Sequence, residues 1–137
     1  MDSQQPEKRD VSTFPRVGSH RDLQVWQKAM DLVVAVYAVA RELPTVERFA
    51  LASQMRRAVS SIPANIAEGK ARGTAKSFLN FLTIADGSLA ELDTHLETAV
   101  RTGYIKREQQ SPLLEQMQEI GRMINGLKRS IARTLAD

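Results

Sequence analysis

Apolar residues recur at alternating steps of three and four along most of the chain, the spacing that places them on one face of a helix. The pattern is widest between residues 23 and 43, where two such stripes run side by side. Ser19 and Asp22 resemble a capping box that opens this helix, and Pro44 ends it. Two adjacent stripes make a face wide enough to contact several helices or a second subunit. The stripes are Leu23, Trp26, Met30, Val33, Tyr37 and Ala40, and beside them Val25, Ala29, Leu32, Val36, Val39 and Leu43.

Further helix boundaries follow from capping residues and glycines. Thr45 is placed to cap a second helix, whose end is bracketed by Gly69 and Gly73. Thr74 opens a third helix, which ends at Gly103. We therefore expect the second helix to end between Gly69 and Gly73, and the third to run from Thr74 to a stop at Gly103.

A fourth helix is predicted from Ser111, which a proline follows, to the C-terminal region. Gly87 lies inside the predicted third helix, where close packing of a neighbouring backbone would account for it. No segment shows the sustained alternation of apolar and polar residues that is typical of a strand. The sequence thus predicts an all-α fold, an antiparallel up-down-up-down four-helix bundle, with helices long and wide enough to favour self-association.

One line of polar residues marks the second helix. Arg57, Ser61, Asn65, Glu68 and Arg72 follow at steps of four, four, three and four, so a helix stacks them along one face. Pro63 interrupts this stretch, and because it lacks an N–H group it predicts a bend in the helix. We expect the neighbouring polar side chains to bond the backbone groups that the bend exposes.

Length and composition restrict the alternatives. A chain of 137 residues suffices for one domain with a sizeable core, which we place at residues 19–137 after a flexible tail at 1–18. The chain has no cysteine, so a disulfide framework and a thiolate zinc site are excluded. The N-terminus lacks the apolar region of a secretory signal, and the longest uncharged apolar run, 32–40, is too short to span a membrane. These features predict a cytoplasmic protein.

Charge is modest in total but uneven along the chain. Nineteen basic and sixteen acidic side chains give a formal net charge of +3. Residues 56–76 are rich in arginine and lysine, whereas the formal charges between Phe78 and Val100 are all acidic. We therefore expect separate basic and acidic zones on the surface.

Several sequence blocks resemble a known family. They are His20–Ala29, Gln54–Ala58, Ser61–Gly69 and Gly87–Leu92, the third being the most specific. In this order and spacing they are similar to the bacterial four-helix bundle proteins encoded by intervening sequences of 23S ribosomal RNA genes. The resemblance covers about residues 19–135, and it departs from the usual pattern at His20, where many members have Phe.

The resemblance implies a left-handed four-helix bundle that assembles into a homopentameric ring. It also implies a fold similar to the accessory protein that works with the reverse transcriptase of diversity-generating retroelements and engages both enzyme and RNA. Nucleic-acid binding is an expectation that this resemblance carries, together with docking to such a partner enzyme.

Two interpretations of the polar line remain open. As a recognition surface, its flanking cations Arg56, Arg57, Lys70, Arg72 and Lys76 would contact phosphates. As a structural motif, Ser61, Pro63, Asn65, Glu68 and Gly69 would form a satisfied internal network that fixes the helix register. The structural interpretation is favoured, because polar groups beside an apolar stripe usually need partners inside the fold.

A second basic face is predicted on the fourth helix. It carries Arg122, Lys128, Arg129 and Arg133. In a monomer these side chains offer few phosphate contacts, whereas a ring repeats them and gains avidity. They are therefore candidates for nucleic-acid binding, although a solvated helix face explains them equally simply. The aromatic residues Trp26, Tyr37, Phe78 and Phe81 belong to apolar stripes, so no base-stacking platform is expected.

Catalysis and metal binding have little support in the sequence. Glu91 and His95 are one helical turn apart and could share a metal, but the only other histidine, His20, begins the first helix. A surface ion pair explains the two residues more simply. Neither a phosphate-binding loop nor a dinucleotide fingerprint is present. We therefore expect no enzyme activity, no cofactor and no metal.

These observations predict a non-enzymatic helical homo-oligomer that binds RNA or DNA weakly through repeated basic patches. The alternative is a protein-interaction scaffold or accessory subunit that docks a partner enzyme such as a reverse transcriptase. The partner, the cellular process and the faces that join the subunits are not specified by these patterns.

Overall fold

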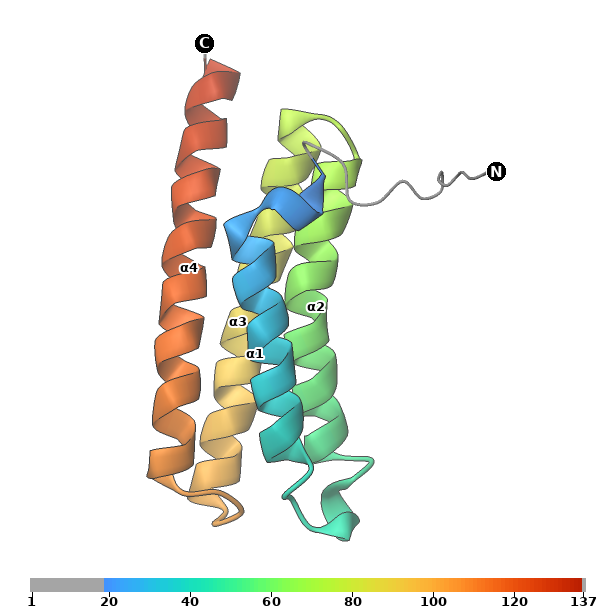
Figure 1. Ribbon diagram of the computed structural model, residues 1–137, viewed down its shortest axis with the longest axis vertical. Helices are drawn as coiled ribbons and strands as arrows, with labels where there is room; N and C mark the ends of the chain where they lie inside the picture. The colour runs from blue at the N-terminus through green and yellow to red at the C-terminus, as the bar shows by residue number, and fades with distance from the viewer. Residues whose placement is uncertain (1–18, 137) are drawn as a thin grey trace, which may run out of the picture.

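The computed structural model describes residues 19–136, so the predicted tail at 1–18 lies outside the described residues. Within them the chain forms four α-helices and no strand: α1 (Gln24–Ala40), α2 (Leu51–Ala71), α3 (Ala75–Arg101) and α4 (Arg107–Ala136). Successive helices run in opposite directions, as Figure 1 shows. Each of α1 and α3 packs against both α2 and α4. The predicted antiparallel arrangement of four helices is confirmed.

The first two helices begin later than predicted. Ser19 caps a 3₁₀ turn, His20–Asp22, and not an α-helix, because its Oγ accepts from the backbone N–H of Arg21 at 3.2 Å. Leu23 then takes an extended conformation with φ −81° and ψ 124°, so α1 starts at Gln24. Thr45 likewise opens a short 3₁₀ turn that ends at Glu47, and α2 starts at Leu51.

The fourth helix begins earlier than predicted, at Arg107 and not at Ser111. The side chain of Gln109 accepts a hydrogen bond from the backbone N–H of Lys106 at 2.9 Å, which satisfies a donor at the helix start. Pro112 consequently lies inside the helix. The predicted starting signal was Ser111 followed by a proline, whereas the helix start in the structure carries a side-chain bond from the Lys106 N–H group to Gln109.

The third helix has both predicted ends. Thr74 accepts from the backbone N–H of Ser77 at 3.1 Å, and Gly103 follows the helix with φ 84°. Gly73 terminates α2 with φ 81°, a conformation that favours glycine. The helix ends at Ala71, between Gly69 and Gly73 as predicted, and Gly69 lies buried inside its last turns.

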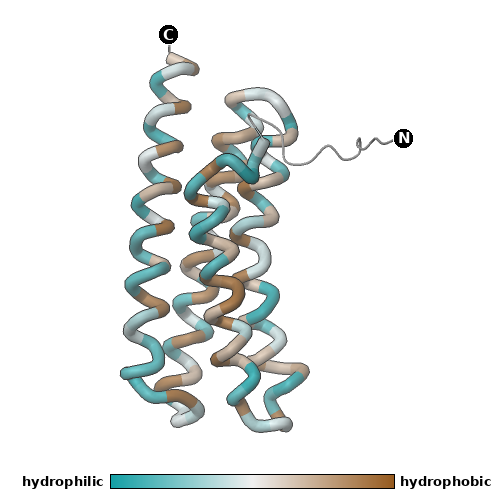
Figure 2. Tube along the Cα trace, in the orientation of Figure 1, coloured by the Kyte–Doolittle hydropathy of each residue, from teal (hydrophilic) through white to brown (hydrophobic). Residues whose placement is uncertain are grey.

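The core lies between the four helices and is formed by their apolar stripes. Figure 2 shows apolar and hydrophilic positions alternating turn by turn along the helices. On α1, Leu32 and Val36 of one stripe are fully buried, whereas Trp26 and Val33 of the other stripe are half-buried and Met30 is exposed. Part of the second apolar stripe of α1 is therefore left at the surface.

No helix in the described part of the chain is long and apolar enough to cross a membrane.

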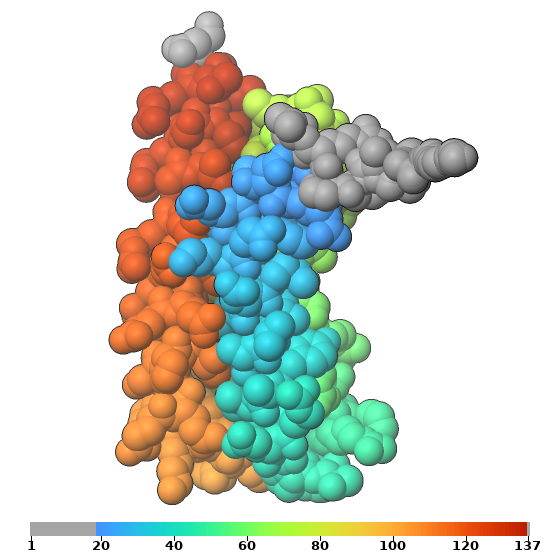
Figure 3. Space-filling view, viewed as in Figure 1, coloured from blue at the N-terminus to red at the C-terminus, as the bar shows by residue number. Residues whose placement is uncertain are grey.

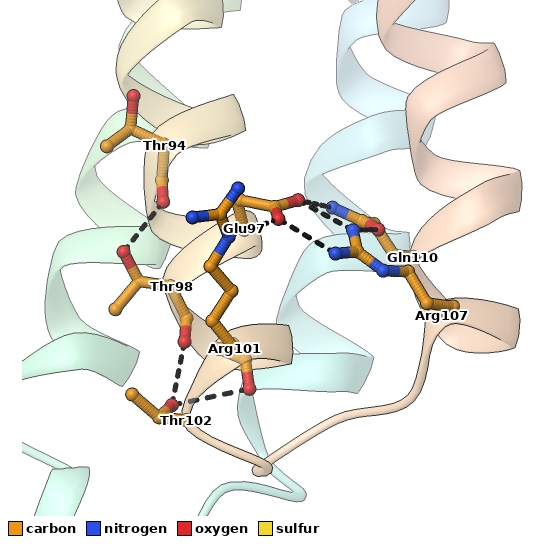
Figure 4. Close-up of polar contacts among 8 residues, drawn as sticks. Thr94, Glu97, Thr98, Arg101, Thr102, Arg107 and Gln110 are labelled. Carbon is orange, nitrogen blue, oxygen red and sulfur yellow. Dashed lines mark hydrogen bonds and ion pairs between the residues drawn. The ribbon is translucent and has the colours of Figure 1, made fainter.

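A cluster around Glu97 ties the end of α3 to the start of α4 (Figure 4). Its carboxylate accepts two hydrogen bonds from the Arg107 guanidinium, at 2.8 and 2.9 Å, and one from Gln110 at 2.9 Å. Arg101 donates a further bond at 2.8 Å. Arg107 first, then Gln110 and Arg101, hold the pKa of Glu97 well below its ordinary value of 4.5. Because the pKa of Glu97 is lowered in the folded state, its ionised carboxylate stabilises the folded protein above pH 4.5. This contribution is lost as the pH falls and the carboxylate becomes protonated.

The two connections at this end of the bundle are also tied to each other. The Gln109 side chain donates to Glu42 at 2.7 Å, and the Tyr104 hydroxyl donates to Glu47 at 2.8 Å. The bond to Glu47 raises the pKa of Tyr104 above its ordinary value, since it favours the neutral hydroxyl. The α1–α2 connection is thus held by the α3–α4 connection, through Tyr104, and by the first turn of α4, through Gln109.

Candidate nucleic-acid interface

The polar line of α2 meets α3 through a short chain of hydrogen bonds. The Ser61 and Ser88 hydroxyls are 2.7 Å apart, and Ser88 is buried. The Asn65 amide donates to the Ser61 hydroxyl at 2.9 Å and to the Ser61 carbonyl at 2.8 Å. Pro63 has no N–H group, so the carbonyl of Val59 lacks its usual helical donor. Asn65 does not take that place, because it bonds the carbonyl of Ser61. These contacts join two helices, and α2 continues through the proline as one helix.

Gly69 allows α2 and α3 to approach closely. A Cβ at this position would lie 2.7 Å from the Cβ of Phe81 and 3.2 Å from Cδ1 of Phe78. Gly87 shows the opposite situation, because a Cβ there would meet nothing within 4 Å. The expectation that a neighbouring backbone packs against Gly87 is therefore wrong, and Gly69 is the glycine with that role.

Glu68 lies outside the hydrogen-bonded chain between α2 and α3. Its carboxylate pairs with Arg72 at 2.7 Å, and both side chains are about half exposed. The Arg72 guanidinium also lies over the ring of Phe81, 4.9 Å from its centre. The predicted pairing of Glu68 with an arginine is present, but it lies at the surface and not in an internal joint.

The basic residues that flank the polar line separate into two groups. Arg57 and Lys70 are thirteen positions apart on α2, which is about 20 Å along a helix. Arg56 and Arg57 lie toward the α1–α2 connection. At the other end of the bundle, Lys70 lies over the Phe78 ring at 5.9 Å and lines a recess with residues of α4, while Lys76 is exposed.

The arginines near the α1–α2 connection surround a surface hollow of about 440 Å³. Figure 3 shows this connection projecting from the molecule beside α2. The hollow is lined by Tyr37, Arg48, Phe49, Ser53, Arg56, Arg57 and Ser60, and none of these described residues is acidic. Arg56 lies over the Tyr37 ring at 5.7 Å, and Arg48 over the Phe49 ring at 4.9 Å. The structure thus gathers three cations and two aromatic rings around one concave surface.

Two residues of this hollow, Arg48 and Phe49, were missed in the sequence. Phe49 follows Thr45, where the second helix was predicted to begin, but it lies before α2 and its side chain is 85% exposed. The connection turns away from the helix after Pro44, so the apolar period does not apply to it. A usable signal was present in the adjacent Arg-Phe pair ahead of the Arg-Arg pair at 56–57.

Glu47 fixes the segment that carries Arg48 and Phe49. Its carboxylate accepts from Tyr104 at 2.8 Å and from the backbone N–H of Leu51 at 3.2 Å, so it caps α2 and anchors the connection at once. Glu47 thus holds the backbone next to two of the residues that line the hollow.

An apolar groove continues along the same α1–α2 seam. It is lined by His20, Trp26, Met30, Val33, Ser60, Pro63, Ala64 and Ala67, with a volume of about 310 Å³. Ser60 borders both the groove and the hollow, and its hydroxyl lies 3.4 Å from that of Tyr37. The seam thus has an arginine-rich half and an apolar half.

The predicted basic residues of α4 lie in the C-terminal half of that helix. Arg122, Arg129 and Arg133 are exposed and Lys128 is half-buried. Figure 1 shows the C-terminal part of α4 reaching beyond the start of α1. These cations lie toward the end of the bundle that holds Lys70 and Lys76, and away from the arginine hollow.

Glu91 and His95 lie one turn apart on α3, with 3.7 Å between a carboxylate oxygen and Nε2. Within residues 19–136 no group of three or more His, Cys, Asp or Glu side chains is placed to hold a metal. The Glu91 carboxylate is exposed whereas the His95 side chain is largely buried, and the distance between them is too long for a hydrogen bond.

Comparison with known proteins agrees with this fold. A profile described as 23S rRNA-intervening sequence protein matches residues 21–126. Among solved structures, the chain is similar to a protein of unknown function from the S23 ribosomal protein family of Bacteroides thetaiotaomicron. The two share 28% sequence identity with a TM-score of 0.71, over 76% of this chain and 97% of that chain. No curated protein matches the chain. Because the profile covers well over half of its residues, the chain belongs to the 23S rRNA-intervening sequence protein family.

Proposed function

We propose that this protein is a non-enzymatic oligomer that binds RNA or DNA through basic surfaces repeated around the assembly. The observation that carries the proposal is the hollow in which Arg48, Arg56 and Arg57 converge without a carboxylate among the lining residues. Guanidinium groups suit phosphate geometry, and an anchored segment loses little freedom when a ligand binds. The hollow is therefore suited to a phosphodiester strand.

Assembly strengthens this binding. The family resemblance implies a ring of five copies, whose formal charge would be 5 × 3 = +15. Weak contacts in each copy then act together on a single strand, because the second and later contacts are intramolecular. The apolar groove supports self-association, since Trp26, Met30 and Val33 leave an apolar surface open beside the hollow.

Nucleic-acid binding is tested by its salt dependence. We expect the affinity for a labelled RNA to fall linearly with salt on a logarithmic scale, with a slope of about −0.7 to −0.9 for each phosphate neutralised. Arg57→Ala should flatten the slope by the amount of about one phosphate contact for each engaged subunit. Lys106→Ala is the control, because it removes the same charge from an exposed position outside the hollow and should leave the slope unchanged. Absent or salt-independent binding would contradict the proposal.

Self-association is tested by light scattering. The native protein should have a mass several times that of the 15.3 kDa chain, and Met30→Glu should lower it because it places a charge in the apolar groove. Val46→Glu is the control, because Val46 is 79% exposed in the α1–α2 connection and outside the groove. A native protein that is monomeric at micromolar concentration would rule out the repeated surface.

A second candidate function is a scaffold that docks a partner protein, and the same apolar groove favours it. If the native oligomer forms while the groove remains open to solvent, a partner is the better occupant. Recovery of one stoichiometric partner that Met30→Glu releases would then support docking, and its absence would count against it.

A further inference from the structure

We propose that the arginine hollow binds single-stranded nucleic acid, with one unpaired base stacked on Phe49 and its flanking phosphates held by Arg48 and Arg57. This inference rests on the proposed nucleic-acid function and names the form of the strand. It follows from placing an exposed aromatic ring within a cluster of guanidinium groups.

The Phe49 ring is available for stacking. Its side chain is 85% exposed although it lines the hollow. The Arg48 guanidinium lies over the ring 4.9 Å from its centre, so one face has a cationic partner while the ring remains largely open. A base on the open face would complete a stack of guanidinium, phenyl ring and base, an arrangement that tolerates any base.

The size of the hollow fits one nucleotide unit. Its volume of about 440 Å³ lies within the usual range for small-molecule sites. Ser53 and Ser60 add hydroxyl groups to the lining, and Arg56 is held over the Tyr37 ring at 5.7 Å. Arg57 is exposed at the rim, where a phosphate of a passing strand can reach it.

The form of the ligand follows from the stacking. In a duplex each base is already stacked between its neighbours, so its plane is not available to an aromatic side chain. A single strand can turn one base outward at little cost, while its phosphates remain close to the arginines. The hollow therefore discriminates by strand form and not by base sequence.

The experiment compares three probes with the full-length protein: a mixed-sequence single-stranded RNA, its duplex with the complement, and an abasic phosphodiester strand of equal length. The native protein should bind the single strand most tightly. Phe49→Leu keeps an apolar side chain but removes the ring, and it should weaken single-strand binding by about five- to hundredfold. Binding of the duplex and of the abasic strand should change less than about twofold, since neither stacks a base on the ring.

Val46→Ala is the matched control, because it alters an equally exposed apolar side chain of the same connection outside the hollow. It should leave all three affinities unchanged. Equal binding of the three probes, or a single-strand preference that survives Phe49→Leu, would overturn this inference and leave the proposed nucleic-acid function standing. Failure of every probe to bind would overturn both.

Discussion

The two faces of α2 differ in how completely they are closed. Toward α3, Gly69 brings the backbones together and Ser61 bonds Ser88 at 2.7 Å. Toward α1, Ser60 and Pro63 line the apolar groove at the surface. The Ser60 hydroxyl lies 3.4 Å from that of Tyr37, which is a longer and weaker contact than the one between Ser61 and Ser88. Adjacent serines thus serve different neighbours, because consecutive residues of a helix point about 100° apart. The segment from Ser60 to Gly69 therefore contains both a structural face and an accessible one.

Among substitutions that test the difference between the two faces of α2, the largest change in stability is expected at Gly69. Gly69→Ala should lower the free energy of unfolding by about 2 kcal/mol, because the added Cβ overlaps Phe81 Cβ at 2.7 Å. Urea denaturation at fixed protein concentration measures the change, since assembly makes stability concentration-dependent.

Gly87→Ala is the matched control in the middle of α3. With nothing within 4 Å of the new Cβ, it should raise the free energy of unfolding by up to about 1 kcal/mol through helix propensity. If both substitutions shift the urea midpoint in the same direction, close approach at Gly69 is not what distinguishes the two positions.

A smaller effect is expected from the hydroxyl pair on the closed face. Ser61→Ala and Ser88→Ala should each cost about 1 kcal/mol, since each leaves a partner group with one bond fewer in a partly buried site. A double-mutant cycle should return a coupling energy of at least about 0.5 kcal/mol. Additive losses would mean that the two hydroxyls do not stabilise each other.

The smallest effect belongs to the open face. Tyr37→Phe removes the hydroxyl that contacts Ser60 at 3.4 Å and should change stability by less than about 0.5 kcal/mol. A loss as large as that of Ser88→Ala would show that both faces of α2 are equally closed, and the distinction between them would fail.

The helices could be predicted from the sequence because each buries a periodic stripe, which is a local property. Boundaries that depend on a single side chain were less accessible: Ser19 caps a 3₁₀ turn, and Gln109 starts α4 ahead of Ser111. Of the two stripes on α1, periodicity could not say which would be buried, since that depends on where the other helices lie.

The candidate site was predicted only in part, because its residues meet across the fold. Arg56 and Arg57 stood out by charge, but Phe49 gained its position from a connection that Tyr104 holds across 57 residues through Glu47. Ser88 likewise lies 27 residues from Ser61. Pairings of this kind are set by the register between helices, which no local pattern encodes.

The ties between the two connections have a consequence for how the molecule opens. Both described ends of the chain, at residues 19 and 136, lie at one pole of the bundle, whereas the bonds of Glu42 and Glu47 close the opposite pole (Figure 1). Segments with few buried contacts open most readily, so we expect amide hydrogens in the exposed last turns of α4 to exchange before those of the two connections. The arginine hollow lies beside the α1–α2 connection that these bonds hold, so we expect it to keep its shape while the last turns of α4 open.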